Sequence, residues 1–260
     1  MAGFDGGREI DWGKTSEDYA RHRPGPPQSF YNLLAAHGVG LPGQRLVDVG
    51  TGTGVLAREF ARRGLHVSGV DVAQGQIAMA RALAKDEGLD IDFGVAPAEH
   101  TGLPDQSFDI LTASQCWIYF EPEAIRAEIQ RLLLPGGRVV ISHFSFLPRQ
   151  DPIVAASEAL VLEYNPDWAG ADWDGETLAI PDLSISGSHL RAFFRYDEAI
   201  PFTRERWKGR MRALRGTGAT LDAATLAKFD ADHDALLKDI AGETFTILHR
   251  IDAHVFELPS

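Results

Sequence analysis

Between Arg45 and Ser142, short apolar runs alternate with stretches of helical periodicity, and this alternation constrains the fold more than any other feature of the sequence. Such runs are typical of strands that are buried on both faces of a parallel sheet, with helices connecting them. Five strands are predicted here: Arg45–Val49, His66–Val70, Ile91–Val95, Phe108–Thr112 and Arg138–Ser142. The pattern therefore predicts an α/β fold with a mostly parallel sheet.

The predicted connections are helices that begin near Gly54, near Gln74 and at Glu121-Pro122. The last of these carries an apolar stripe of Ile125, Ile129, Leu132 and Leu133. A proline suits the first turn of a helix, because its missing N–H has no partner there. Pro135-Gly136-Gly137 is expected to end this helix in a turn, since proline cannot continue it and glycine tolerates positive φ.

After Ser142 the periodicity changes. A helix is expected over Ile153–Tyr164, followed by Asn165–Glu176, a loop rich in Pro, Gly and Asp that is typical of a lid. The remaining expected elements are a strand over Ala192–Ile200, a basic helix over Arg204–Arg215, a helix with the inner stripe Leu226, Phe229, His233, Leu237 and Ile240, and a period-2 antiparallel strand over Phe245–Val255 with its odd positions facing inward.

Charge and composition exclude several classes of protein. The chain has 25 Lys and Arg against 37 Asp and Glu, a net charge of −12, which argues against nucleic-acid or membrane-surface partners. No apolar run is long enough for a membrane span, and the first thirty residues are too charged for a signal peptide, so a cytoplasmic protein is expected. The single cysteine, Cys116, excludes an internal disulfide and a thiolate zinc site, and no other metal-binding constellation stands out.

The junction between the first strand and the first helix reads Val47-Asp48-Val49-Gly50-Thr51-Gly52-Thr53-Gly54. Alternating glycines let the backbone approach a ligand closely and expose amide groups at a helix start. Asp71 ends the second strand, where a carboxylate can accept hydrogen bonds from both hydroxyls of a ribose. A dinucleotide fingerprint would need its third glycine at Val55, and Asp48 would repel a pyrophosphate, so a cationic nucleoside is favoured.

These residues resemble the class I S-adenosylmethionine-dependent methyltransferases. The resemblance covers about residues 40–145 and consists of Asp48-x-Gly50-x-Gly52-x-Gly54, Gly69-Val70-Asp71, Leu103–Asp109 and Leu133–Gly137, in the family's order. Asp18–Pro24, Pro97–Pro104 and Trp117 before Phe120 are similar to the small-molecule branch, the methyltransferase type 11 and trans-aconitate methyltransferase-like proteins, which also include quinone- and sterol-type enzymes.

The resemblance implies S-adenosylmethionine as the cofactor and a role for each matching residue. Gly50, Gly52 and Gly54 would accommodate its methionine part, Asp48 would lie near the ammonium group, and Asp71 would hold the ribose. The remaining implied contacts are Val72 against the adenine, Ala98 and Glu99 at the adenine edge, Ser114 and Gln115 at the methionine part, and Tyr19 as an N-terminal flap. Many relatives carry an acid where Ala96 or Pro97 stands here, so adenine recognition would rest on backbone groups or on Glu99.

Methyl transfer requires the acceptor, the methyl carbon and the sulfur to be held in line without water, and acid–base groups are optional. Trp117 and Tyr119 are candidate walls of the reaction site, with plain packing as the alternative. His143 is the candidate general base, with a hydrogen-bonded rim histidine as the alternative. Cys116 is interpreted as a small buried hydrophobe and His249 as an interior residue without catalytic duty.

The stretch Arg191–Arg215 is basic within an acidic chain: Arg191, Arg195, Arg204, Arg206, Lys208, Arg210, Arg212 and Arg215 stand against Asp197, Glu198 and Glu205. Guanidinium groups pair bidentately with carboxylates, so one hypothesis is a clamp for an acceptor that bears a carboxylate. The alternative is a solvated basic face of a helix.

Together these observations predict a seven-stranded, mostly parallel, doubly wound Rossmann-like methyltransferase sheet with helical caps. The predicted parts are an N-terminal helical flap (1–39), a SAM-binding core (40–145), and cap helices with a lid and the last two strands (146–260). The family implies that the last strand is antiparallel beside the fifth. The predicted activity is methyl transfer to a small molecule. The alternatives are a protein or RNA methyltransferase, an NAD-dependent oxidoreductase and a non-catalytic nucleoside-binding protein; the oligomeric state is open.

Overall fold

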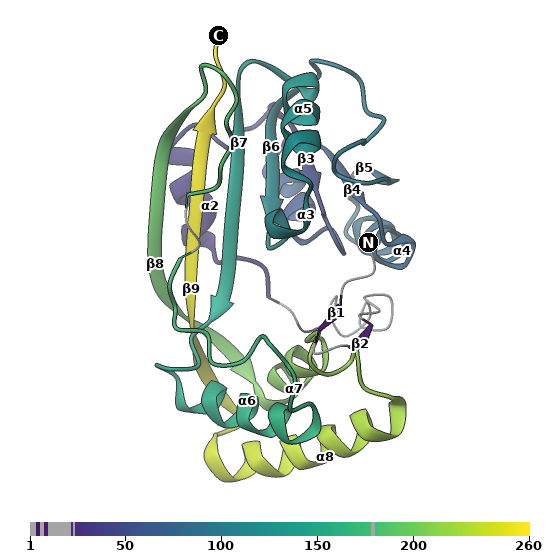
Figure 1. The fold of residues 1–260 in the computed structure, drawn as a ribbon, viewed down its shortest axis with the longest axis vertical. Helices are drawn as coiled ribbons and strands as arrows, with labels where there is room; N and C mark the ends of the chain where they lie inside the picture. Colours follow the sequence, from purple (N-terminus) through teal and green to yellow (C-terminus); the bar gives the residue numbers. More distant parts are fainter. Residues whose placement is uncertain (1–3, 6–7, 10–21, 23, 178–179) are drawn as a thin grey trace. The chain divides into compact units, whose positions relative to one another are not determined.

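The structure is a computed structural model that describes residues 4–5, 8–9, 22, 24–177 and 180–260 (Figure 1). The chain divides into two compact units. The sheet unit consists of Gly25–Phe144, Thr177–Tyr196 and Ile251–Ser260. The helical unit consists of Met1–Pro24, Ser145–Glu176 and Asp197–Arg250. Each unit is therefore assembled from segments that are far apart in the sequence.

The main sheet has seven strands in the order β5-β4-β3-β6-β7-β9-β8. Their bounds are Arg45–Val49 (β3), His66–Asp71 (β4), Ile91–Val95 (β5), Phe108–Ser114 (β6), Leu133–Phe146 (β7), His189–Thr203 (β8) and Thr244–Glu257 (β9). The pairs β3–β4, β3–β6, β4–β5 and β6–β7 are parallel. The predicted mostly parallel, doubly wound sheet is confirmed, and all five strands predicted in the core are present.

The last strand, β9, lies between β7 and β8 and runs antiparallel to β7, as the opposed arrows in Figure 1 show. The amide of Leu147 donates to the carbonyl of Leu248 over 3.1 Å, and the amide of Leu258 donates to Gly137 over 2.9 Å. Residue numbers therefore fall along β9 as they rise along the paired β7, which is the pattern of an antiparallel pair. The position and direction that the family resemblance implied for the last strand are confirmed.

Helices cover both faces of the sheet: in Figure 1, α5 lies in front of it and α2 and α3 lie behind. The helical elements are α2 (Gln28–Ala36), α3 (Val55–Arg62), α4 (Gln74–Asp86), α5 (Pro122–Leu132) and the short 3₁₀ helix η2 (Trp117–Tyr119). The carboxylate of Glu121 accepts the amides of Glu123 and Ala124, and Pro122 is the first helical residue. The predicted start of α5 is confirmed, because cap and proline both favour it.

The predicted end of this helix before Pro135 is confirmed, but Pro135-Gly136-Gly137 does not form a separate turn ahead of the strand. Helix α5 ends at Leu132 and β7 begins at the next residue, so the three residues lie inside the strand. They form an irregularity: Phe108 of β6 pairs with Leu133, and Ile110 pairs with Arg138. Gly136 takes a φ of 73°, which glycine adopts without a steric penalty. The glycines thus permit a bulge in a strand that is already paired with β6.

The core of the sheet unit lies between the central strands and α5. Ile125, Ile129 and Leu132 of α5 pack on the buried side chains of β3, β6 and β7, which include Val47, Val49, Leu111, Val139 and Ile141. Burial of each such aliphatic side chain contributes about 1.5–3 kcal/mol. The core fixes the carboxyl ends of β3, β4, β6 and β7, from which the candidate site residues extend.

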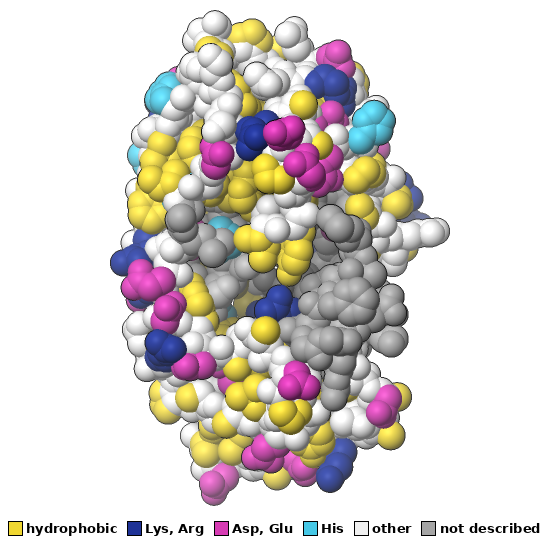
Figure 2. Space-filling view, in the orientation of Figure 1, with side chains coloured by type: hydrophobic (Ala, Val, Ile, Leu, Met, Phe, Trp, Pro, Cys, Tyr) yellow, Lys and Arg dark blue, Asp and Glu magenta, His cyan; other side chains and the backbone are white. Residues whose placement is uncertain are grey.

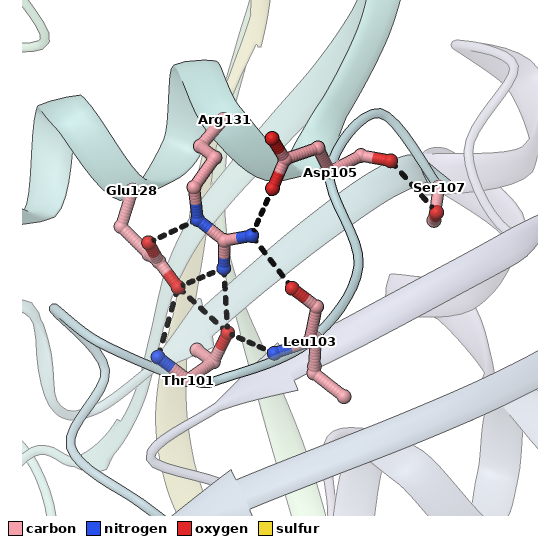
Figure 3. A network of polar contacts seen from close by, with 6 residues as sticks. All are labelled: Thr101, Leu103, Asp105, Ser107, Glu128 and Arg131. Carbon is pink, nitrogen blue, oxygen red and sulfur yellow. Dashed lines mark hydrogen bonds and ion pairs between the residues drawn. The ribbon is translucent and has the colours of Figure 1, made fainter.

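A polar network ties the segment between β5 and β6 to α5 (Figure 3). The carboxylate of Glu128 accepts the amide and the hydroxyl of Thr101 over 2.8 and 2.6 Å. Arg131 donates to both oxygens of Glu128, to the carbonyl of Leu103 and to Asp105. The network immobilises the loop that follows Glu99.

The helical unit contains α6 (Pro152–Tyr164), α7 (Arg204–Arg212) and α8 (Ala223–Ile240), together with the short strands β1 (Phe4–Asp5) and β2 (Arg8–Glu9). The expected helices are confirmed, although the basic helix ends at Arg212. In α8, Phe229, His233 and Leu237 are buried, but Ile240, which was predicted to face inward, is 40% exposed because the helix ends there. No helix among the described residues is long and apolar enough to cross a bilayer.

Trp168 of the predicted lid is buried within the helical unit, and a Cβ at Gly216 would lie 2.6 Å from its ring. Within the same unit, the hydroxyl of Ser157 accepts the indole N–H of Trp207 over 3.0 Å and contacts Nε2 of His233 at 2.9 Å. Trp207 is fully buried. Aromatic packing therefore organises this unit around α6, α7 and α8.

Candidate nucleoside site

The loop between β3 and α3 has three alternating glycines in the left-handed region, with φ of 64° at Gly50, 57° at Gly52 and 74° at Gly54. A side chain other than glycine is strained there. A Cβ on Gly50 would lie 2.8 Å from the sulfur of Cys116, and one on Gly54 would lie 2.8 Å from the ring of Phe93. Packing therefore requires glycine at the first and third positions.

The middle glycine of the loop faces open space. A Cβ on Gly52 would have only the Oε1 atom of Gln76 within 4 Å, at 3.9 Å. The amide of Gly52 donates to Oδ2 of Asp71 over 2.9 Å, so β4 holds the loop at this point. The backbone at Gly52 is thus a fixed wall beside a space that a ligand can fill.

Asp71 is fixed by two backbone amides. Its Oδ2 accepts from Gly52, and its Oδ1 accepts from Ala73 over 2.8 Å. A carboxylate offers about four lone-pair sites, so each oxygen can accept one further hydrogen bond. Because the side chain is only partly buried, the remaining acceptors suit a vicinal pair of hydroxyls such as those of a ribose.

Asp48 lies at the base of the loop and is 3% exposed. Its oxygens accept the hydroxyls of Thr51 and Thr112, both over 2.6 Å. Burial raises the pKa of the Asp48 carboxyl to about 6. The hydrogen bonds from the two hydroxyls lower this pKa, and the negative charge of Asp71 raises it, but burial has the largest effect. A positive charge bound nearby would favour the ionised form.

The residues expected at the adenine differ in exposure. Val72, which follows Asp71, is 63% exposed and offers an apolar surface to a flat ring. Ala98 is buried in the core, and Oε1 of Glu99 accepts the backbone amide of Glu121 over 2.9 Å. Glu99 thus helps to fix the start of α5.

Ser114 and Gln115 stand at the carboxyl end of β6. Gln115 has a φ of 67°, an unusual conformation for a residue with a side chain. Its amide donates to the carbonyl of Ser142 over 3.0 Å, and its side-chain amide donates to the carbonyl of Phe144. Strained residues concentrate at functional sites, because only a rigid surrounding holds them in place.

The aromatic residues of η2 have different environments. Trp117 is partly buried and packs edge-on against Phe120, at 6.0 Å between ring centroids. Tyr119 and Ile118 are 48% and 63% exposed. Figure 2 shows hydrophobic side chains exposed just below α5, where this segment lies. Tyr119 is therefore available to a ligand, whereas part of Trp117 serves the core.

The single cysteine belongs to the scaffold of the site. The thiol of Cys116 donates to the carbonyl of Val49 at 3.3 Å and fills the space that Gly50 leaves free. Burial raises the pKa of the Cys116 thiol well above its usual range, and the nearby Asp48 and Asp71 raise it further. The thiol is therefore unreactive, in agreement with the interpretation as a small hydrophobe.

Nδ1 of His143 on β7 lies 3.0 Å from Oδ1 of Asp252 on β9. Sequence reasoning missed Asp252, since an acid at an even position of a period-2 strand was interpreted as exposed. In the structure Asp252 and His254 are 1% and 2% exposed, so this part of β9 is buried on both faces of the sheet. A weak signal was present: apolar residues also become frequent at even positions near the end of the strand. His249, as expected, is buried.

Four of the basic residues in Arg191–Arg215 contact acidic side chains: Arg191, Arg204, Lys208 and Arg212. Lys208 contacts Asp234 at 3.1 Å, and Arg212 contacts Asp230 at 2.5 Å, so both tie α7 to α8. Arg210 is 7% exposed, and its guanidinium lies 5.1 Å from the centre of the Phe146 ring. The alternative of a solvated basic face is therefore wrong for Lys208, Arg210 and Arg212. Tyr19, the proposed flap residue, lies outside the described residues.

The chemistry of the loop fits S-adenosylmethionine: open space at Gly52, an acid for hydroxyls at Asp71, an apolar surface at Val72 and a buried acid at Asp48. The sheet order and this loop define a domain of the class I S-adenosylmethionine-dependent methyltransferases, and residues 47–141 match the methyltransferase domain family.

Individual relatives agree with this assignment. The chain is 33% identical over 112 residues to the ubiquinone biosynthesis O-methyltransferase of Aeromonas salmonicida, a match that covers 42% of this chain and 47% of that protein. The chain thus spans about half the length of this curated relative.

Two solved structures share the fold. A candidate type II methyltransferase from Anaeromyxobacter dehalogenans superposes with a TM-score of 0.58 at 21% identity, covering 92% of this chain and 99% of that chain. An N-methyltransferase from Haemonchus contortus, solved with phosphomonomethylethanolamine and S-adenosylhomocysteine, gives a TM-score of 0.51 at 19% identity and covers 96% of this chain and 57% of that chain.

Proposed function

We propose that the protein transfers a methyl group from S-adenosylmethionine to a small-molecule acceptor. The observation that carries the proposal is the loop at Gly52, where open space lies beside a carboxylate, Asp71, that two backbone amides hold in place. The match of residues 47–141 to the methyltransferase domain family supports the same cofactor.

The cofactor supplies a methyl group on a positively charged sulfur, which is already activated for displacement. In the proposal, the loop at Gly50, Gly52 and Gly54 holds the methionine part together with Ser114 and Gln115, while Asp48 supplies negative potential. Asp71 binds the ribose, and Val72 with the backbone at Ala98 and Glu99 holds the adenine. Tyr119 and Trp117 exclude water from the line of transfer, so orientation supplies most of the rate.

The acceptor is proposed to be small and to receive the methyl group on oxygen, as the name of the Aeromonas salmonicida relative states for that protein. A carboxylate-bearing acceptor is the more specific form of the proposal. Arg212 no longer supports it, because this residue is engaged by Asp230. Arg210→Ala tests this form of the proposal: it is expected to raise the KM of an anionic acceptor, and an unchanged KM contradicts the anionic acceptor.

Calorimetry with S-adenosylhomocysteine and with NAD tests the cofactor directly. Binding of S-adenosylhomocysteine in the micromolar range is expected, without binding of NAD, and Asp71→Asn is expected to weaken it by about tenfold or more. The reverse preference would favour the oxidoreductase alternative, and the absence of any heat with S-adenosylhomocysteine at millimolar concentration contradicts the proposal.

Transfer of a labelled methyl group separates the remaining alternatives. Label from S-adenosylmethionine is expected in the low-molecular-mass fraction when metabolite extract is supplied. Label in protein or RNA would favour a macromolecular acceptor. Binding of S-adenosylhomocysteine without transfer to any fraction would favour a non-catalytic nucleoside-binding protein.

A further inference from the structure

The pair formed by His143 and Asp252 lies outside every motif that pointed to the cofactor. The two residues face each other on adjacent antiparallel strands, in the register that the hydrogen bond from Leu258 to Gly137 sets. Asp252 is 1% exposed, and His143 is its hydrogen-bond partner within the described part of the chain. A buried carboxylate needs a donor, so the nitrogen that faces it carries the proton.

Gln115 fixes the backbone on both sides of His143. It donates from its amide to Ser142 and from its side chain to Phe144, the two residues that flank the histidine. Gln115 is itself a proposed contact of the methionine part of the cofactor. His143 therefore lies next to the proposed transfer site, on a strand that cannot shift without breaking these hydrogen bonds.

We propose that Asp252 is a positioning residue that presents His143 as the general base for a hydroxyl acceptor. The inference rests on the proposed methyl transfer. With the Nδ1 proton donated to Asp252, the lone pair of the ring is on Nε2, and the carboxylate stabilises the imidazolium that forms. A hydroxyl oxygen is a weak nucleophile until its proton is removed, so it needs such a base. A thiol ionises more readily, and an unprotonated amine is nucleophilic before it loses a proton.

A lone pair of the acceptor oxygen forms the bond to the methyl carbon of the sulfonium donor, and the carbon–sulfur bond breaks with its electrons remaining on sulfur. The hydroxyl proton passes to Nε2 of His143. The products are the methyl ether, the neutral thioether and an imidazolium paired with Asp252, which later releases its proton to water.

Other charged and titratable groups facing the pair have partners of their own or are neutral. His254, two residues on along β9, stacks on Phe193 at 4.5 Å between ring centroids, and burial lowers its pKa, so it is uncharged at neutral pH. Arg195 of β8 donates to the hydroxyl of Thr177 over 2.9 Å. Arg250, two residues before Asp252, contacts Asp197 with two hydrogen bonds of 2.7 Å. Asp252 is thus left to act on His143.

Nitrogen-15 NMR of the histidine rings in the full chain tests the geometry without an acceptor. At neutral pH the neutral ring of His143 is expected to carry its proton on Nδ1, and Asp252→Asn is expected to give a mixture of tautomers. A proton on Nε2 in the unmodified protein, or the same single tautomer in Asp252→Asn, overturns the proposal. Glu257→Gln is the matched control, since this β9 carboxylate pairs with Arg138 and Arg191 instead.

Carbon-13-methyl S-adenosylmethionine with catechol, benzyl alcohol, benzylamine and thiophenol tests the acceptor class. Methyl groups are expected on oxygen. The rate is expected to fall about 100-fold in His143→Gln and about tenfold in Asp252→Asn. The pH–rate profile of Asp252→Asn should also move, and Asp252→Glu should restore part of the rate. Methylation only on nitrogen or sulfur, or an Asp252→Asn profile like that of the unmodified protein, overturns the proposal.

Binding of S-adenosylhomocysteine separates the two levels of inference. Binding without methylation of any of the four probes overturns the hydroxyl acceptor and leaves the cofactor site intact. If the unmodified protein does not bind S-adenosylhomocysteine, the proposed function itself is overturned.

Discussion

Asp48 carries an electrostatic cost in the folded protein. Burial raises its pKa to about 6, even though the hydroxyls of Thr51 and Thr112 both donate to it. Since the unfolded carboxyl titrates near 3.8, this group contributes stability below that pH, and the contribution is lost as the pH rises towards 6. Ionisation of Asp48 near neutral pH therefore lowers the stability of the fold, and a bound cation would reduce that cost.

Binding of S-adenosylhomocysteine, whose amino group is positive, is expected to release protons at pH 6. Asp48 is about half protonated there, so about half a proton per site should leave as the bound ammonium favours the carboxylate. Calorimetry in buffers of different ionisation enthalpy measures this number. Asp48→Asn should bind more weakly and release none; proton release that persists in this variant would assign the effect to another group.

Gly52 and Gly43 form a matched pair for testing the ligand space. Both have positive φ, 57° and 83°, and a Cβ on Gly43 would have nothing within 4 Å. Alanine at either position should cost the fold about 1–2 kcal/mol through backbone strain. Only Gly52→Ala should weaken S-adenosylhomocysteine binding, by about tenfold or more, because its methyl group enters the proposed ligand space. Equal affinities of the two variants in calorimetry would contradict that placement.

At the scale of the element, α5 anchors the loop between β5 and β6. Burial raises the pKa of Glu128, but the hydrogen bonds from Arg131 and Thr101 outweigh this effect and hold it at about 2. The side chain is 4% exposed, so its hydrogen bonds are shielded from water. The helix thereby fixes the segment that carries Ala98 and Glu99, which connects packing on α5 to the proposed adenine site.

Glu128→Gln is expected to lower the free energy of unfolding by about 2 kcal/mol at pH 7, because the two hydrogen bonds from Arg131 then no longer end on a carboxylate. The native pKa is depressed, so the difference from the unmodified protein should be full above pH 4.5 and fade as the pH falls towards 2. Urea unfolding at several pH values measures it. Glu123→Gln, at an exposed position of the same helix, should change stability by less than about 0.5 kcal/mol.

At the scale of the whole molecule, the chain combines a methyltransferase domain with a helical unit built from three separate segments. Within the helical unit, Lys208 and Arg212 of α7 contact Asp230 and Asp234 of α8. These pairs neutralise much of the local positive charge that stands out in the acidic sequence. The net charge of −12 is therefore less unevenly distributed than the sequence indicates.

S-adenosylhomocysteine at 100 times its dissociation constant is expected to stabilise the native chain by about 2.7 kcal/mol, since a ligand selective for the native state shifts the equilibrium by mass action. Thermal unfolding measures this as a rise in Tm. Asp71→Asn, tested at the same ligand concentration, should show about half of this stabilisation or less, since a tenfold weaker affinity leaves about 1.4 kcal/mol. NAD should give no rise with the unmodified protein. An equal rise in Asp71→Asn would remove Asp71 from the binding site.

The sequence by itself determined the parallel strands, the glycine loop and Asp71, because these depend on local periodicity and on spacing within one β-α-β unit. Tertiary structure decided what depends on distant segments. His143 and Asp252 are 109 residues apart and meet only because β9 pairs with β7. The same reason applies to three other features: the burial of Asp252, the bulge at Pro135–Gly137 and the acidic partners of Lys208. Each depends on a neighbouring strand or helix from another part of the chain, and no local pattern specifies that neighbour.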